Sequence, residues 1–185
     1  MTEISPALRR RLSMRRWLTL VGVSALVTSG CGTAGGDDVP SVEGADDGYA
    51  DVEVSTFEGV PFRLAELHGT PVVVNFFASW CAPCVREMPE IEAVKRELAD
   101  DIVVVGVNVM DDEDKADQLV ADTGITWRLV RDADGSLLRA VGGRAMPTTI
   151  VIDSAGVIVA ARSGAITGDE LMELLAPVLE GDGDG

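Results

Sequence analysis

Short apolar runs alternate with helical periodicities along residues 52–178 of this chain. Residues 72–77 and 102–109 are almost uninterruptedly apolar, which is typical of strands in a sheet covered on both faces. Residues 52–56 alternate like a half-exposed strand that turns back toward residues 62–64. A further short strand is expected over 127–130, and residues 148–152 and 157–161 predict a hairpin around a polar turn.

Three segments carry a helical period. A helix from about residue 84 to 98 is expected to bury Met88, Ile91, Val94 and Leu98 and to kink at Pro89. The acidic residues 111–114 predict the start of a second helix that ends before Gly124. A last helix opens near Thr167 and should bury Leu171, Leu174, Leu175 and Val178. The order β-(β)-β-α-β-α-β-α-β-β-α, which places a fourth helix between the strand at 127–130 and the hairpin, predicts an α/β sandwich with a mixed sheet.

The first thirty residues have the pattern of an export signal. Five Arg between residues 9 and 16 precede the apolar stretch 17–28, which is too short to span a bilayer. Thr28-Ser29-Gly30 then precedes Cys31 and resembles a bacterial lipoprotein signal. We therefore expect residues 1–30 to be removed and Cys31 to become the lipidated first residue. A conventional signal peptide and twin-arginine export remain alternatives.

Glycine and aspartate dominate residues 31–50 and 181–185. Such segments cannot bury enough apolar surface to fold, so they predict an acidic tether behind Cys31 and a disordered tail. One domain is expected over residues 51–180. The chain has a net charge of −16, which argues against nucleic acid and against attraction to an anionic membrane surface. Membrane attachment would therefore depend on the lipid.

The candidate chemistry lies in Trp80-Cys81-Ala82-Pro83-Cys84, directly after the strand at 72–77. A helix N-terminus favours a thiolate at its first cysteine, and a cysteine three residues on can close a short disulfide. This context predicts thiol–disulfide exchange. The alternative is half of a zinc site, but zinc usually needs four ligands. Only His68, expected at the surface, adds a soft ligand once Cys31 is set aside.

Residues 75–89 resemble the active-site segment of the TlpA/ResA family of membrane-anchored thioredoxin-like disulfide reductases. Met146-Pro147-Thr148-Thr149 is similar to the cis-proline loop of that family, and the helix expected over 113–122 matches its insertion. The resemblance covers residues 50–180. It implies a thioredoxin-like sandwich with a central mixed β-sheet flanked by helices, the helical insertion and an N-terminal hairpin.

The resemblance also assigns roles to particular residues. Cys81 would be the exposed nucleophile and Cys84 the buried resolving thiol. Pro147 would be cis and Met146 would offer its backbone to an extended substrate, whereas a trans edge-strand proline is the alternative. Trp80 would shield the disulfide or simply pack beside it.

Glu87 lies where this family carries an acid near the cysteine pair. A carboxylate there would raise thiol pKa values and exchange protons, whereas the alternative is a solvated glutamate on the helix face. Asn75 occupies the strand position of the buried aspartate of thioredoxin. An amide cannot exchange protons, which leaves Glu87 as the expected proton relay.

The resemblance implies an extracytoplasmic reductase without a cofactor that acts on exported disulfide- or dithiol-containing proteins. Apocytochrome c is one candidate substrate, and a membrane electron donor would restore the dithiol. A thiol oxidase with the same residues is an alternative. A copper metallochaperone would need a His or Met cluster, and the chain offers only Met88 and Met146. A peroxiredoxin would need Thr at position 78, where this chain has Ala78.

Overall fold

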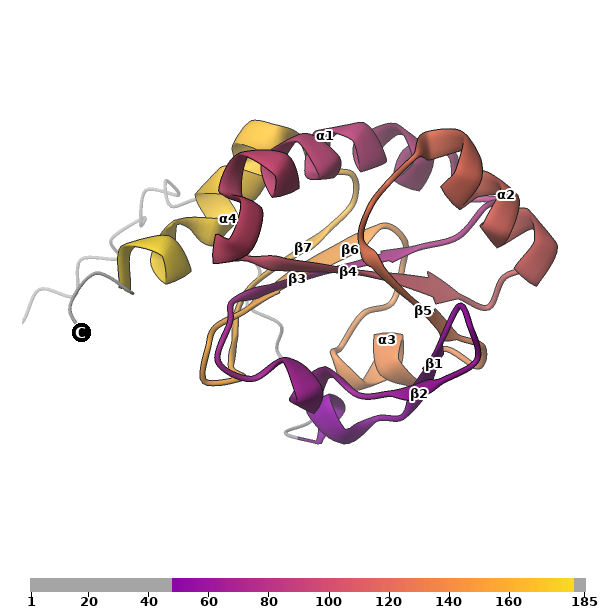
Figure 1. The fold of residues 1–185 in the computed structure, drawn as a ribbon, viewed down its shortest axis with the longest axis horizontal. Coiled ribbons are helices and arrows are strands. Elements are labelled where there is room, and N and C mark those ends of the chain that lie inside the picture. The colour runs from indigo at the N-terminus through magenta and orange to yellow at the C-terminus, as the bar shows by residue number, and fades with distance from the viewer. Residues whose placement is uncertain (1–47, 182–185) are drawn as a thin grey trace, which may run out of the picture. The chain divides into compact units, whose positions relative to one another are not determined.

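The computed structural model describes residues 48–181, which contain a single mixed sheet of seven strands. The strand order is β2-β1-β5-β4-β3-β6-β7 (Figure 1). The strands are β1 (Val54–Thr56), β2 (Pro61–Phe62), β3 (Val72–Phe77), β4 (Val103–Val109), β5 (Arg128–Asp132), β6 (Thr148–Ile152) and β7 (Ile158–Ser163).

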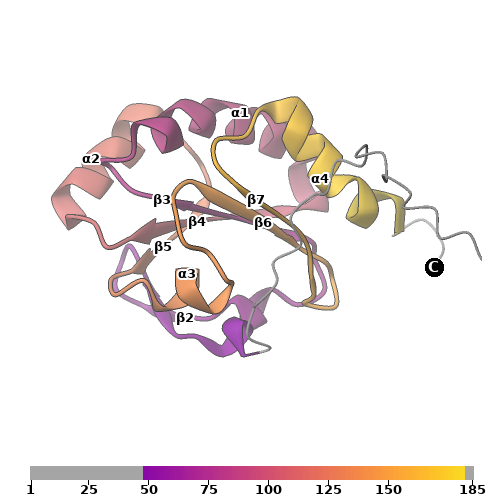
Figure 2. The same cartoon turned by 180° about the vertical axis from the view of Figure 1, so that it is seen from behind.

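Helices cover both faces of the sheet. They are α1 (Ala82–Leu98), α2 (Glu113–Thr123), α3 (Ser136–Ala140) and α4 (Gly168–Gly181), with short 3₁₀ turns at Tyr49–Asp51, Leu64–Leu67 and Ala99–Asp101. Figures 1 and 2 show α1, α2 and α4 on one face and α3 on the other. This is the thioredoxin-like arrangement expected from the sequence.

The two-residue period of a strand divides the core into two layers. Alternate residues of β3 belong to different apolar clusters: Val72, Val74 and Phe76 pack on the α3 side, and Val73 and Phe77 pack with α1 and α4. By the same alternation, Asn75 faces the α1 side. A polar side chain thus lies on the same face of β3 as the apolar Val73 and Phe77.

Strand directions bring the two sequence motifs together. β3, β4 and β5 are parallel, with α1 and α2 as their crossovers, whereas β6 runs antiparallel to β3. Phe76, near the end of β3, pairs with Thr148 at the start of β6. The loop after β3, which carries the cysteines, therefore emerges beside the loop that contains Pro147.

Most expected elements are confirmed, with shifted boundaries. The β1–β2 hairpin, the extra helix α2 and the β6–β7 hairpin are present. α1 begins two residues earlier than expected and runs through Pro89 as one helix. Leu98 and Leu174 are half-buried rather than buried, because each lies at the edge of its helix contact. The strand expected over 127–130 is β5 and extends to Asp132.

The predicted signal, Cys31, most of the tether and residues 182–185 of the tail lie outside the described residues. Between residues 48 and 181, no helix is both long and apolar enough to cross a bilayer.

Gly106 provides a test of packing in the layer beneath α1. It lies in β4 opposite Asn75, where a Cβ atom would come within 2.9 Å of Leu129 Cδ2 and 3.0 Å of Trp127 Cε3. Gly106→Ala should therefore lower the free energy of unfolding by about 1–3 kcal/mol in urea denaturation. Val159→Ala, at an exposed position of β7, should change it by no more than about 0.5 kcal/mol. Wild-type stability of the Gly106 variant would contradict this account.

Candidate active site

The two cysteines form a disulfide at the N-terminus of α1. Cys81 is the N-cap residue and Cys84 lies in the first turn, with an S–S distance of 2.07 Å and a Cα–Cα distance of 5.3 Å. The Cys84 backbone N–H donates to Cys81 Sγ at 3.4 Å. A sulfur at this position faces the unpaired N–H groups and the positive end of the helix dipole, which stabilise a thiolate after reduction.

The exposure of the pair differs from the expectation. Cys81 is 5% exposed and Cys84 is fully buried, so the expected difference between them is present but small. Cys81 is less exposed than expected because its sulfur is bonded to Cys84 and its side chain packs into the apolar cluster beneath α1. Trp80 is the exposed neighbour, with 64% of its surface accessible.

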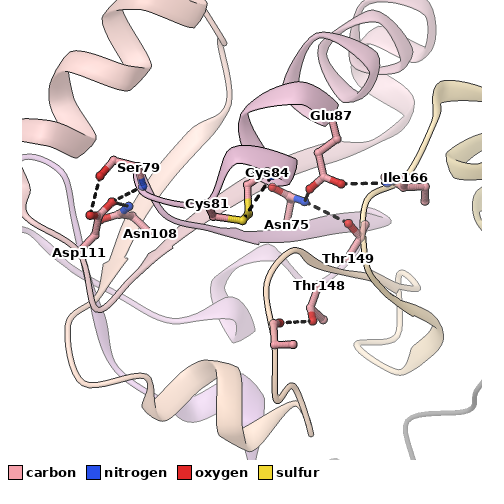
Figure 3. Close-up of a disulfide and its surroundings, with 11 residues drawn as sticks. Asn75, Ser79, Cys81, Cys84, Glu87, Asn108, Asp111, Thr148, Thr149 and Ile166 are labelled. Carbon is pink, nitrogen blue, oxygen red and sulfur yellow. Dashed lines mark hydrogen bonds between the residues drawn. A yellow bond between two sulfur atoms is a disulfide. The ribbon is translucent and has the colours of Figure 1, made fainter.

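The peptide bond between Met146 and Pro147 is cis, as the resemblance to the TlpA/ResA family implied. Pro147 precedes β6, and its carbonyl oxygen accepts a hydrogen bond from the Gly164 N–H at 2.8 Å. Thr148 Oγ1 donates to the Ala145 carbonyl oxygen at 2.7 Å, which closes the loop (Figure 3). Met146 is partly buried and packs against both apolar clusters, including the one that contains both cysteines.

Glu87 lies one helical turn after Cys84 and is only 2% exposed, so the interpretation as a solvated surface glutamate is wrong. Asn75 Nδ2 donates to its Oε1 at 2.7 Å, and the Ile166 N–H donates to its Oε2 at 2.9 Å (Figure 3). Burial raises the pKa of Glu87 to about 7, although both hydrogen bonds act in the opposite direction. A carboxyl group with this pKa can accept or release a proton near neutral pH.

Sequence reasoning did not find the hydrogen-bond network of Asp111. Its carboxylate accepts from the Ser79 N–H at 2.5 Å, from Ser79 Oγ at 2.7 Å and from Asn108 Nδ2 at 2.8 Å. Burial raises the pKa of Asp111, but these hydrogen bonds outweigh burial and leave the pKa below its usual value. The network ties the loop before Cys81 to the end of β4. Ser79 and Asp111 each follow one of two adjacent parallel strands, and this is the feature from which their contact could have been predicted.

His68, which was considered as a further zinc ligand, is not part of the cluster that contains the two cysteines. His68 is exposed and its ring lies against Gly156, in the turn between β6 and β7. Met88 is fully buried within the α1 layer. Within the part of the chain that the structure describes, no cluster of three or more His, Cys, Asp or Glu could hold a metal ion.

Comparison with known proteins agrees with this geometry. The family described as Redoxin matches residues 34–174. The chain belongs to this family.

Two curated relatives of this Redoxin chain are named for the same chemistry. Thiol-disulfide oxidoreductase ResA of Halalkalibacterium halodurans is 35% identical over 65% of this chain and 70% of its own length. Thiol:disulfide interchange protein HelX of Rhodobacter capsulatus is 36% identical over 67% and 70%. The chain is thus a thiol-disulfide oxidoreductase similar to ResA, and its structure contains the Cys81–Cys84 disulfide.

A solved structure shows the same fold. It is a secreted Mycobacterium tuberculosis disulfide oxidoreductase homologous to E. coli DsbE, with a TM-score of 0.63 and 25% identity. The match covers 71% of this chain and 98% of that protein.

The buried position of Glu87 predicts a pH-dependent stability. With a pKa of 4.5 in an unfolded chain and about 7 in the folded state, the folded protein keeps a proton that the unfolded chain has released between these values. This stabilisation is complete below about pH 4.5 and is lost as the pH rises through about 7. Its size is about 3 kcal/mol.

Urea denaturation of the oxidised protein across this pH range measures the effect. The decline in unfolding free energy should largely disappear in Glu87→Gln, whose side chain does not titrate. Glu97→Gln, an exposed position on the same helix, should retain the decline. Equal slopes for Glu87→Gln and wild type would show that the carboxyl group is not held protonated by burial.

Proposed function

We propose that this protein is an extracytoplasmic disulfide reductase that acts on exported proteins through the Cys81–Cys84 dithiol. The observation that carries this proposal is the buried, uncompensated carboxyl group of Glu87, one turn beyond Cys84. It supplies both a proton acceptor for the exchange and a reason for the direction of electron flow.

In the reduced protein, the Cys81 thiolate attacks one sulfur of a partner disulfide. A Cys81–partner disulfide forms, and the other partner sulfur leaves with the electron pair and takes a proton from water. Cys84 then loses its proton and attacks Cys81 Sγ. The Cys81–Cys84 disulfide forms and the second partner sulfur leaves as a thiolate. Two electrons thus pass from the dithiol to the partner.

Glu87 is the proposed acceptor of the Cys84 proton. Residues 84 and 87 are three apart on α1, so their side chains leave the same face of the helix. Cys84 is fully buried and cannot release its proton directly to bulk water. A carboxyl group with a pKa of about 7 matches this task at neutral pH.

The direction follows from the charge near the sulfurs. A strongly oxidising disulfide requires a stabilised reduced thiolate, which nearby cations would provide. Among the described residues, the Cys84 N–H is the group that donates a hydrogen bond to the sulfurs, and no Lys, Arg or His side chain donates one. An ionised Glu87 opposes a thiolate at Cys84. These features favour a reductase.

A thiol oxidase is the second candidate, and the position of Cys81 favours it. As N-cap of α1, Cys81 has its thiolate stabilised by the helix dipole, which shifts the couple toward oxidation of other thiols. The helix dipole and Glu87 therefore act in opposite directions on the couple.

Trp80, Met146 and Pro147 are the proposed substrate contacts. Trp80 is exposed beside Cys81, and the cis bond at Pro147 precedes the strand that pairs with β3. An extended segment containing a disulfide could lie between them. Exported proteins with paired cysteines, apocytochrome c among them, are the proposed substrates, and a membrane dithiol donor would return the electrons.

The compartment is inferred from the signal-like residues 1–30 and from Cys31. The similar disulfide oxidoreductase of Mycobacterium tuberculosis is a secreted protein, and disulfide chemistry is typical of oxidising compartments. We infer that the chain is a lipoprotein on the outer face of the cytoplasmic membrane. The tether expected over residues 31–50 would end before Tyr49, which is buried in the core of the catalytic domain and donates to the Gly156 carbonyl oxygen at 2.6 Å. Residues 51–180 would form the rest of that domain.

The reduction potential of the Cys81–Cys84 couple tests the direction. Equilibration of the purified domain with glutathione and dithiothreitol buffers, next to thioredoxin and DsbA as references, should give a value near that of thioredoxin, about −270 mV. A value as oxidising as that of DsbA, about −120 mV, would refute the reductase and support the oxidase.

Cys31→Ala tests the membrane anchor. Because the acidic chain has little electrostatic attraction to an anionic membrane, loss of the lipid should move the protein from the membrane fraction to the soluble fraction or the medium. Mass spectrometry should find an acyl group on wild-type Cys31. Cys84→Ser serves as the matched cysteine control and should stay at the membrane. Membrane association of Cys31→Ala, together with an unmodified wild type, would contradict the lipoprotein interpretation.

A further inference from the structure

In the side-chain amide of Asn75, the nitrogen makes hydrogen bonds and the oxygen makes none. Its nitrogen donates to Glu87 Oε1 at 2.7 Å and to Thr149 Oγ1 at 3.0 Å. Its oxygen, Oδ1, is fully buried and has no hydrogen-bond partner among the described residues. Figure 3 shows the amide between the disulfide and Glu87, with its nitrogen toward Glu87 and its oxygen on the disulfide side. A buried acceptor without a partner is costly and calls for a physical reason.

The oxidised state supplies that reason. While Cys81 and Cys84 share a disulfide, neither sulfur carries a proton to donate. Reduction gives Cys84 a thiol on the side of the amide where Oδ1 lies. The thiol S–H is a weak donor, and Oδ1 is an acceptor without a competitor. In the oxidised protein, Oδ1 therefore has no hydrogen-bond partner among the described residues.

An amide can serve either charge state of both neighbours, because its two ends have nearly the same shape and opposite hydrogen-bonding character. In the observed orientation, nitrogen donates to an ionised Glu87 and oxygen can accept from a Cys84 thiol. After a half-turn of the amide, oxygen accepts from a protonated Glu87 and from the Thr149 hydroxyl. The nitrogen then donates to a Cys84 thiolate. Each orientation fits one position of the proton.

We propose that Asn75 is a positioning residue whose amide rotates with the proton that passes between Cys84 and Glu87. The proton leaves Cys84 Sγ and binds a Glu87 carboxylate oxygen, and the rotated amide stabilises the resulting thiolate and carboxylic acid together. The Cys84 thiolate then forms the bond to Cys81 Sγ, and the partner sulfur leaves with the electron pair. This inference rests on the proposed role of Glu87 but holds for either direction of electron flow.

The surroundings of Glu87 suit such a coupling because they are uncharged. Asn75 meets the carboxyl group from β3, the Ile166 N–H meets it from the loop before α4, and Thr149 of β6 lies beyond Asn75. Burial and these two hydrogen bonds set its pKa, with no contribution from a charged side chain of the described residues. On its own helix, Cys84 is the titratable group one turn earlier. A proton gained by Glu87 therefore changes the hydrogen bonding of Asn75 and the electrostatic surroundings of Cys84.

Nuclear magnetic resonance of the wild-type protein tests the rotation directly. In protein labelled with ¹⁵N at asparagine, the side-chain resonances of Asn75 should shift on reduction. They should also titrate in the reduced protein with the pKa of Glu87. Asn108, whose amide binds Asp111, is the internal control and should do neither. Resonances of Asn75 that are indifferent to reduction and to pH would overturn the proposal.

Exchange kinetics test the coupling. With oxidised glutathione as the probe, Glu87→Gln should move the pH midpoint of the exchange rate in the wild-type background by about one pH unit or more. In an Asn75→Leu background the same substitution should move it by much less. Thr149→Val, which removes the hydroxyl but leaves the Asn75–Glu87 contact, should retain most of the Glu87 effect.

The outcomes separate the two proposals. If Glu87→Gln has the same effect in the wild-type and Asn75→Leu backgrounds, Glu87 acts without Asn75 and only the coupling fails. If it has no effect in the wild-type background, both roles fail. Asn75→Asp keeps the shape of the side chain and replaces the donor with a second oxygen. It should also weaken the Glu87 effect, and it provides the test if Asn75→Leu does not fold.

Discussion

The carboxyl group of Glu87 is buried in an apolar layer without a counter-charge, and the arrangement around the disulfide follows from that constraint. A lone charged group is costly in such a place, so the group takes a raised pKa and two hydrogen bonds instead. One hydrogen bond comes from the central strand and the other from the loop before α4. The same helix that buries Glu87 also carries Cys84. The redox pair and the carboxyl group therefore share one helix, which packs against the central strand and the loop before α4.

Sheet topology provides the two partners of α1. Parallel strands β3 and β4 place the loops that begin at Ala78 and Met110 at one edge of the sheet, where Asp111 holds Ser79. The antiparallel pairing of β6 with β3 places the cis-proline loop at the same edge and sets Thr149 opposite Asn75. The positions of the loops around the active site thus depend on strand register.

Opposed electrostatic effects act on the two sulfurs. Cys81 faces the positive end of α1, which stabilises its thiolate, while Cys84 lies deeper and closer in sequence to an acidic group. Such a separation suits the two steps of exchange. The outer sulfur must be ready to attack, and the inner sulfur must be deprotonated only after the mixed disulfide has formed.

Local sequence determined the order of the elements, the position of the cysteine pair at a helix start and the capping of α2 by Asp112 before Gly124. These features depend on contacts between residues close in the chain, where periodicity and capping rules apply. Tertiary structure decided the rest. Glu87 is one of several acids on α1, and its burial depends on the packing of α4 and β3 against it. The unpaired oxygen of Asn75 and the network of Asp111 depend on strand register and on the pairing of loops more than thirty residues apart. A sequence read locally contains no signal that fixes such distances.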